Sequence, residues 1–239
     1  MVSRGVASTG SRWSSRRGVV VLGAALVVAV VSLLFVRVAD GARADGDRCE
    51  LFTADSRERA AQVTGSGERV VVIGDSWSVG LGLDRPVASW PSRLEGSVHV
   101  AGFSGSGFSP GASECRAVSF ADRAPEALRG RPELVVVEGG LNDYDQSRTD
   151  IRAGFERLMV ALDGHRVAIV GPATAPSRAA AVPQVDRLLA RLAADADVAY
   201  VRTSDLELSY LDDRLHLTPA GHEAFGDFVA ARLVALGLG

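Results

Sequence analysis

The sequence is poor in the residue types that most metal sites require. It has no lysine, so all 26 basic residues are arginine, and it has only four histidines and two cysteines. No HExxH pattern occurs, and two cysteines are too few for the usual structural zinc site, so we expect no metal centre. With 47% hydrophobic and 23% charged residues, the chain is nonetheless globular, and 239 residues suffice for one large domain.

Acidic residues are missing from the first 39 positions. Five arginines precede Asp40, whereas the other 21 stand against all 29 acidic residues, which gives a net charge of -8 from Asp40 onward. A nucleic-acid partner needs a basic surface, so this acidic main part argues against one. The basic excess lies only at the N-terminus, beside an apolar run, and this placement indicates a membrane.

Only one long apolar run occurs, from Gly18 to Val36. Its 19 residues carry no charge, and a helix of that length spans about 28 Å, close to the roughly 30 Å of a bilayer core. Residues 1–17 contain four arginines, so we expect them to form a basic cytoplasmic tail, with residues 18–38 as a single-pass anchor and the rest extracytoplasmic. The alternative is a cleaved signal, with residues 42–44 as the cleavage site and a secreted product.

The two cysteines, Cys49 and Cys115, are a lone pair in the sequence. In an oxidising compartment such a pair is expected to be joined. We therefore predict a Cys49–Cys115 disulfide that ties the segment after the anchor to a loop of the main domain. The alternative is two buried free thiols.

Residues 39–67 and 68–239 differ in their patterns. The first stretch is polar, contains four glycines, and is predicted to be a linker with one short helix near Ala54–Val63. In the second stretch, valine-rich runs of strand length alternate with helical patterns, which predicts a three-layer α/β sandwich with a five-stranded parallel sheet. The expected strands are Val70–Ile73, Val98–Ala101, Leu134–Val137, Val167–Val170 and Val198–Val201.

Three helices are expected from apolar spacing and capping residues. Apolar side chains recur at helical intervals over residues 151–162 and again over residues 182–192. Ser147 is placed to cap the first of these helices. The last helix begins at Thr218-Pro219, a cap followed by proline at the first helical position, and runs to about Leu236.

Polar residues and glycines follow the expected strands. In a parallel α/β sheet, ligands bind at the carboxyl ends of the strands, so these segments are expected to meet at one edge. They supply a hydroxyl, glycine N–H groups, a side-chain amide, an imidazole and a carboxylate, which together are what acyl transfer from an ester requires. The segments are GDS at 74–76, GFSGSG at 102–107, EGGLND at 138–143 and DDRLH at 212–216.

Each of these groups fits one role in ester chemistry. Ser76 is the predicted nucleophile, and His216 is the base that takes its proton. Asp213, three residues before His216, can fix the imidazole tautomer. A tetrahedral intermediate carries a negative oxygen that needs preorganised donors. The candidate donors are the N–H groups of Ser76 and Gly105 and the side-chain amide of Asn142.

Four separated blocks in this order resemble the SGNH (GDSL-type) hydrolases. The blocks are GDS at 74–76, AGFSG at 101–105, GGLND at 139–143 and DRLH at 213–216. The resemblance implies a flavodoxin-like SGNH-hydrolase fold over residues 69 to about 236, with serine esterase or acylhydrolase chemistry and no metal or cofactor. The second block departs from the family pattern at one point. Members of the family often have an asparagine early in this block, and here Val100 stands near that place.

Several residues compete for the assigned roles. His222 is a rival base, but it lies inside the last expected helix and is read as structural. Asp212 is the lesser candidate for the acid. The GFSPG segment matches the G-x-S-x-G pattern with Ser109 as nucleophile, yet it lacks the strand and helix that this pattern needs. Gly102 and Gly107 are alternatives for the glycine oxyanion donor.

The sequence thus predicts a serine esterase outside the cytoplasmic membrane, acting on a small-molecule, glycan or lipid ester as a monomer. No long apolar lid lies between the blocks, which favours short acyl chains or O-acetyl esters over long lipids. Trp77 and Phe103 flank the predicted site and either line it or pack in the core. An O-acyltransferase with the same triad and a non-catalytic surface module with this fold are the alternatives.

Overall fold

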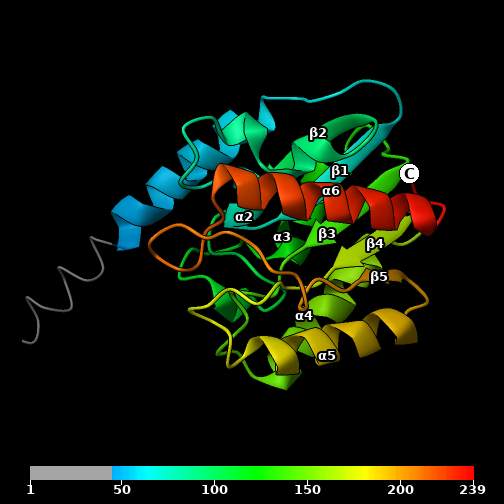
Figure 1. The fold of residues 1–239 in the computed structure, drawn as a ribbon. Helices are drawn as coiled ribbons and strands as arrows, with labels where there is room; N and C mark the ends of the chain where they lie inside the picture. The colour runs from blue at the N-terminus through cyan, green and yellow to red at the C-terminus, as the bar shows by residue number, and fades with distance from the viewer. Residues whose placement is uncertain (1–44) are drawn as a thin grey trace, which may run out of the picture. The chain divides into compact units, whose positions relative to one another are not determined.

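A parallel sheet of five strands forms the centre of the part of the chain that the computed structural model describes, residues 45–239 (Figure 1). The strand order is β2-β1-β3-β4-β5. The strands are β1 (Arg69–Gly74), β2 (Ser97–Gly102), β3 (Leu134–Glu138), β4 (Val167–Val170) and β5 (Ala199–Val201). Each predicted strand is present within one residue of its expected bounds, so the predicted α/β fold with a five-stranded parallel sheet is confirmed.

The helices between the strands include the three that were predicted. Thr218 caps α6 by accepting a hydrogen bond from Gly221 N–H, and Ser147 caps α4 by accepting one from Asp150 N–H. The short α3 was not predicted. The helices are α2 (Ser76–Val79), α3 (Phe120–Ala127), α4 (Arg148–Ala161), α5 (Val182–Asp195) and α6 (Pro219–Ala235), with 3-10 turns at Pro86–Ala88, Trp90–Arg93 and Pro110–Ala112.

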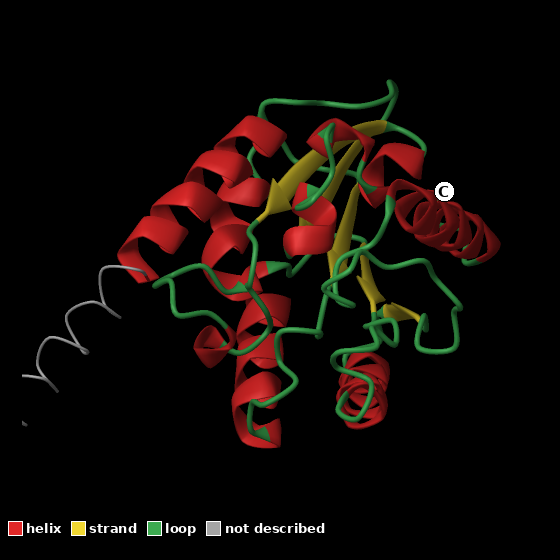
Figure 2. Cartoon of the chain, turned by 60° about the vertical axis from the view of Figure 1, so that its left-hand side comes forward, coloured by secondary structure: helices red, strands yellow, loops and turns green. Residues whose placement is uncertain are grey.

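The two faces of the sheet bury different sets of side chains, because successive residues of a strand point to opposite sides. Val72 and its same-face neighbours pack with Trp90 and with Phe225 of α6. Ile73 and its same-face neighbours pack with α3, α4 and α5, where Phe155 is fully buried. Figure 2 views this arrangement with helices on both sides of the strands. The two buried layers hold the strands rigidly, so the residues at the strand ends have fixed positions.

The prediction of a linker at residues 39–67 is wrong for the described part of that stretch. Residues 45–60 are helical. The helix expected at Ala54–Val63 overlaps only the last part of this longer one, which begins earlier and ends three residues before Val63. The polar composition of this stretch hid the face of the helix that packs against the domain. Phe52 and Arg59 lie on that face, seven positions apart, and one of the two is a charged residue. Arg59 is fully buried, although an arginine in a polar stretch reads as exposed.

Three kinds of contact fasten this helix to the domain. A disulfide joins Cys49 to Cys115. The ring of Phe52 meets Phe103 edge-on, with centroids 6.3 Å apart. The hydroxyl of Ser56 donates a hydrogen bond of 2.6 Å to the last carbonyl of β2. The helix is therefore part of the domain, and it borders the loop that follows β2.

The predicted tail at residues 1–17 and the predicted anchor or signal at residues 18–38 lie outside the described residues. Within residues 45–239, no helix combines the length and the apolar character that crossing a membrane demands.

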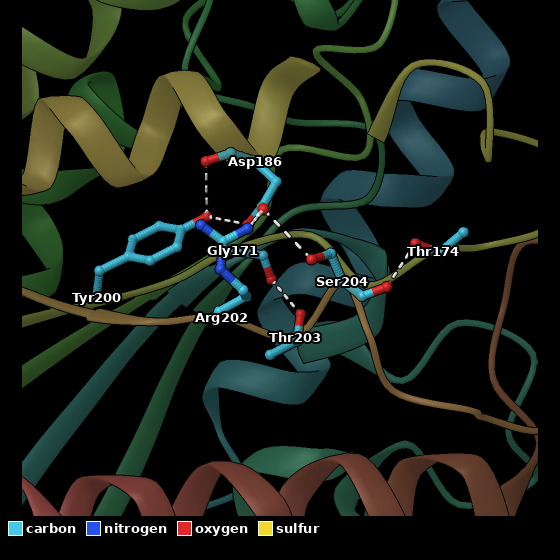
Figure 3. A network of polar contacts seen from close by, with 7 residues as sticks. All are labelled: Gly171, Thr174, Asp186, Tyr200, Arg202, Thr203 and Ser204. Carbon is cyan, nitrogen blue, oxygen red and sulfur yellow. Dashed lines mark hydrogen bonds and ion pairs between the residues drawn. The ribbon is translucent and has the colours of Figure 1, made fainter. Parts of the chain in front are cut away.

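A polar network at the far edge of the sheet ties α5 to the strand β5 (Figure 3). Asp186 of α5 is buried and accepts hydrogen bonds from the hydroxyl of Tyr200 at 2.7 Å, from the Arg202 guanidinium and from Ser204 Oγ at 3.3 Å. These contacts fix the beginning of the segment 202–218, which leads to α6 and contains the DDRLH block.

Candidate active site

The chain turns sharply at the end of β1, and this turn presents Ser76 at the first position of α2. A Cβ atom on Gly74 would lie 2.0 Å from Ser78 Oγ, so glycine at this position leaves room for the Ser78 side chain. Asp75 caps α2, because its Oδ1 accepts a hydrogen bond of 2.9 Å from Trp77 N–H. Asp75 therefore holds the turn through hydrogen bonding.

A continuous hydrogen-bonded chain links Ser76, His216 and Asp213. The distance from His216 Nε2 to Ser76 Oγ is 3.1 Å, and the distance from His216 Nδ1 to Asp213 Oδ2 is 2.6 Å. With Asp213 ionised, Nδ1–H donates to the carboxylate and Nε2 faces the hydroxyl as an acceptor. This is the arrangement in which an imidazole can take the proton of a serine.

Asp213 is itself held by the backbone of its own loop. Its Oδ1 accepts hydrogen bonds of 2.9 Å from the N–H groups of Leu215 and His216. Partial burial alone would raise the pKa of Asp213, but the hydrogen bonds from His216 and Leu215 outweigh this effect and lower the pKa below its usual value. The carboxylate therefore stays ionised throughout the pH range in which a histidine can act as a base.

Three candidate hydrogen-bond donors belong to residues that line the same cleft, Ser76, Gly105 and Asn142. Gly105 adopts φ +80°, a left-handed conformation that favours glycine, and its N–H donates to no other atom of residues 45–239. The same holds for the N–H of Ser76 within this part of the chain. The Asn142 amide donates to Ser106 O at 2.9 Å and to Asp75 Oδ2 at 3.1 Å, and these contacts fix its orientation.

A cleft of about 570 Å³ opens over these groups. Ser76, Gly105, Asn142 and His216 all line it, so the four strand-end segments meet at one place as the sequence predicted. Neither of the rival glycines, at positions 102 and 107, lines this cleft. The geometry therefore favours Gly105 among the three glycine candidates.

A half-buried arginine that the sequence reasoning missed fastens the ends of β1 and β2 together. The Arg123 guanidinium donates hydrogen bonds of 2.9 Å to Gly74 O and to Ser106 Oγ, and it also donates to the carbonyl of Ala101. Burial lowers the pKa of Arg123 to about 10, which leaves it charged at neutral pH. One side chain thus fixes the turn that carries Ser76 and the loop that carries Gly105.

Asp143 fixes the loop that follows Gly105. Its carboxylate is fully buried and accepts hydrogen bonds from Phe108 N–H at 3.0 Å and Ser109 N–H at 2.8 Å. Burial raises the pKa of Asp143 to about 6. Its position in the GGLND block, beside the predicted Asn142, was the signal that could have found it.

Glu138, at the end of β3, stabilises the turn that carries Ser76 through a contact with Ser78 of α2. Its Oε2 accepts a hydrogen bond of 2.7 Å from Ser78 Oγ, which in turn accepts one of 3.1 Å from Trp90 Nε1. Burial, and then the negative charge of Asp75, raises the pKa of Glu138 well above its usual value. An acid at the end of an otherwise apolar strand was the available signal for this residue.

The rival catalytic residues have structural roles. His222 Nδ1 accepts a hydrogen bond of 3.3 Å from Trp90 N–H, and burial lowers the pKa of His222 to about 4. Ser109 is buried and caps the 3-10 turn that follows it, with its Oγ accepting from Gly111 N–H at 3.1 Å. The second acid of the DDRLH block, Asp213 and not the first, reaches the imidazole.

The two aromatic residues that flank the site pack in the core. Trp77 is 1% exposed, and its Nε1–H donates to Leu215 O at 3.1 Å. Phe103 is 5% exposed and packs against Phe52. Neither ring lines the cleft, so core packing is the correct reading for both.

Comparisons with known proteins give one family and a set of structures with the same fold. The model of the GDSL-like Lipase/Acylhydrolase family matches residues 72–224. A search of curated protein sequences finds no match. Several solved structures are similar to this one. A carbohydrate acetylesterase family member from Sinorhizobium meliloti is 21% identical in sequence, with a TM-score of 0.59 over 72% of this chain and 99% of that one.

Two further structures have the same fold at similar distance. An inhibitor-bound aryl esterase from M. smegmatis is 18% identical, with a TM-score of 0.57 over 71% of this chain and 100% of that one. A family two carbohydrate esterase from Clostridium thermocellum, in complex with cellohexaose, is also 18% identical, with a TM-score of 0.57 over 73% of this chain and 66% of that one.

The fold and the matched family together define a class, the carboxylic ester hydrolases built on a parallel α/β sheet. The resemblance seen in the four sequence blocks is thereby confirmed. The chain belongs to the GDSL-like lipase/acylhydrolase family.

Proposed function

We propose that the protein is a serine esterase that hydrolyses short-chain or O-acetyl esters through a Ser76-His216-Asp213 triad and an acyl-enzyme. One observation carries this proposal, namely the chain of contacts from Ser76 Oγ through His216 to Asp213, with distances of 3.1 and 2.6 Å at the floor of an open cleft. Membership of an acylhydrolase family supports the reaction class.

In the first half of the reaction, Ser76 Oγ attacks the ester carbonyl carbon and its proton moves to His216 Nε2. The carbonyl oxygen becomes an oxyanion, which the N–H groups of Ser76 and Gly105 bind together with the Asn142 amide. For this, the Asn142 side-chain amide shifts so that the hydrogen bonded to Asp75 Oδ2 points to the oxyanion instead. The bond to the alcohol oxygen then breaks, this oxygen takes the proton from His216, and the acyl group stays on Ser76.

In the second half, water replaces the alcohol. His216 takes a proton from the water as its oxygen attacks the acyl carbon, and the same donors bind the second oxyanion. The bond between the acyl carbon and Ser76 Oγ breaks, and Oγ recovers its proton from His216. The carboxylic acid leaves and the enzyme returns to its starting state.

The form of the cleft supports a small acyl group on an accessible substrate. The cleft is open, and charged or polar side chains such as Asp145, Gln146 and Arg178 form part of its wall. A long acyl chain needs a mainly apolar channel, because burying polar groups without partners is costly. Two of the similar structures are described as carbohydrate esterases, which supports O-acetyl groups on a saccharide as the substrate class.

The test is hydrolysis of p-nitrophenyl acetate by Ser76→Ala, with Ser109→Ala as the matched control. We expect Ser76→Ala to lose activity by a factor on the order of 10⁴ or more, and Ser109→Ala to remain active. Undiminished hydrolysis by Ser76→Ala would refute the proposal. A series of p-nitrophenyl esters from acetate to decanoate tests the acyl group, and we expect kcat/KM to fall as the chain lengthens.

We also propose that the domain acts outside the cytoplasmic membrane. The charge-free run from Gly18 to Val36 with arginines before it supports this location, and so does the Cys49–Cys115 disulfide, which is typical of oxidising compartments. A fusion of residues 1–47 to a reporter that is active only after export tests the idea. We expect an exported reporter, and an inactive cytoplasmic fusion would contradict the proposal.

A further inference from the structure

One cation that lines the cleft belongs neither to the triad nor to the oxyanion donors. Arg178, on the loop between β4 and α5, lies over the ring of Tyr144, with 3.5 Å between the guanidinium carbon and the ring centroid. Both residues line the cleft that contains Ser76 and His216. Stacking on an aromatic face is a favourable geometry for a guanidinium and fixes the plane in which its N–H groups point.

Arg178 lies between the segment that carries Asn142 and the loop that carries His216. Its Nη1 donates a hydrogen bond of 3.2 Å to the carbonyl of Leu141, the residue before Asn142. The preceding residue, Ser177, donates its N–H to Arg214 O at 3.0 Å, within the loop that carries the catalytic base. The guanidinium is therefore tied to the segment that carries Asn142, and the backbone beside Arg178 is tied to the loop that carries His216.

The other charged side chains that line the cleft have different partners. Arg48 and Glu114 form an ion pair with each other. Asp145 accepts a hydrogen bond of 2.7 Å from Gln146 Nε2, and it forms no ion pair with Arg178. Among residues 45–239, Arg178 forms no ion pair with a carboxylate, and only one of its five N–H donors has an acceptor in a hydrogen bond.

We propose that Arg178 forms an anion subsite and that the natural ester carries an anionic oxygen group, a carboxylate or a phosphate, on its alcohol part. The planar guanidinium can bind such a group through two parallel hydrogen bonds. This inference rests on the proposed esterase function and names the class of its substrate, an acylated acidic saccharide. Arg178 then acts as a specificity determinant beside the reacting atoms.

The first test compares two acetyl esters that differ at one group, which is anionic in the first and neutral in the second. One is a mono-O-acetylated methyl glucuronoside, and the other is the same compound with its carboxylate converted to a primary amide. We expect kcat/KM to be higher for the charged compound, and we expect the ratio of the two values to fall about tenfold in Arg178→Gln. Arg178→Lys keeps the charge without the planar donor pair, so its ratio should lie between those of the two proteins.

Arg187→Gln is the matched control, because it removes the same charge from an exposed position on α5. We expect this variant to keep the wild-type ratio. An unchanged ratio in Arg178→Gln, or an equal fall in Arg187→Gln, overturns the subsite. The same pair of measurements with an O-acetylated glucoside 6-phosphate distinguishes the two anion types, since the subsite favours the one with the larger ratio.

A binding measurement separates failure of the subsite from failure of the esterase function. Calorimetric titration of Ser76→Ala with the non-acetylated methyl glucuronoside needs no turnover. We expect binding that weakens about tenfold when Arg178→Gln is added, and weaker binding of the neutral methyl glucoside to Ser76→Ala. Equal affinity for the charged and neutral sugars overturns the subsite, whether or not the wild type hydrolyses esters. The opposite pattern, Arg178-dependent binding without any hydrolysis, refutes only the esterase proposal.

Discussion

The two sides of the cleft are built in different ways. The side that presents Ser76 and Asn142 consists of strand ends joined by ionisable side chains inside the fold, chief among them Arg123, Glu138 and Asp143. The side that presents Asp213 and His216 is a surface loop, in which Asp213 hydrogen-bonds only to residues within three positions of itself and its side chain is 47% exposed.

This difference predicts different effects of substitutions on stability and on activity. On the nucleophile side, a substitution leaves buried polar groups without partners, so it should lower stability together with activity. On the loop side, the same chemical change removes hydrogen bonds that solvent can replace, so it should lower activity with little effect on stability. Measuring both quantities for each variant therefore tests whether the two sides differ as described.

Replacement of the exposed acid should give the largest effect on activity. Asp213→Asn removes the carboxylate that orients His216, and we expect kcat for p-nitrophenyl acetate to fall by a factor on the order of 10³–10⁴. The melting temperature should change little, because the hydrogen bonds of Asp213 are local and exposed to solvent. Asp212→Asn is the control and should keep most of the activity, and an equal loss there would mean that the acid has been misassigned.

On the opposite side, Asn142→Ala removes one proposed oxyanion donor. We expect kcat to fall by roughly 10²–10³ with a smaller change in KM. Unlike the loop variant, this one also leaves Ser106 O and Asp75 without their shared donor, so thermal melting should reveal a loss of stability. If Asn142→Ala proves as stable as the wild type, the contrast between the two sides does not hold.

Asp143→Ala isolates the structural part of the contrast. The buried N–H groups of Phe108 and Ser109 lose their acceptor, which should lower the free energy of unfolding by roughly 3 kcal/mol in urea titrations. The neighbouring variant Asp145→Ala removes an exposed carboxylate and should change the free energy by less than about 0.5 kcal/mol. Similar values for the two variants would contradict the account.

A pH titration of stability gives the smallest predicted effect. Burial holds the pKa of His222 at about 4 in the folded protein, whereas an unfolded histidine has a pKa near 6.5. The unfolded state therefore binds a proton first as the pH falls, and this group's stabilisation is lost between about pH 6.5 and 4. We expect His222→Gln to flatten this part of the curve by about 1–2 kcal/mol, and an unchanged slope would show that His222 does not contribute.

The sequence predicted the parts of the site that local pattern determines. Ser76, Asn142 and His216 each belong to a short block at the end of an expected strand or before a capped helix, so their convergence followed from the sheet alone. Arg123 could not be found in this way, because it reaches Gly74 from α3, a helix too short to give a clear period.

The full length of the helix at residues 45–60, and its packing against the domain, were missed for a related reason. Its attachment to the domain depends on contacts between distant positions, such as the Phe52–Phe103 ring pair, and the local composition contains no sign of them. The disulfide between Cys49 and Cys115 was the one contact of this helix that the sequence indicated, because only two cysteines exist. Together these cases show that strand-end chemistry was readable from the sequence, whereas the supporting contacts needed the fold.

The central claim, that Ser76 is the nucleophile, is tested most directly by covalent labelling. The protein is treated with a fluorophosphonate, which reacts with activated serines, and the modified residue is located by peptide mass spectrometry. We predict a single adduct on Ser76, formed in step with loss of esterase activity and much more slowly in His216→Gln. An adduct on another serine such as Ser109, or full loss of activity with Ser76 unmodified, would contradict the claim.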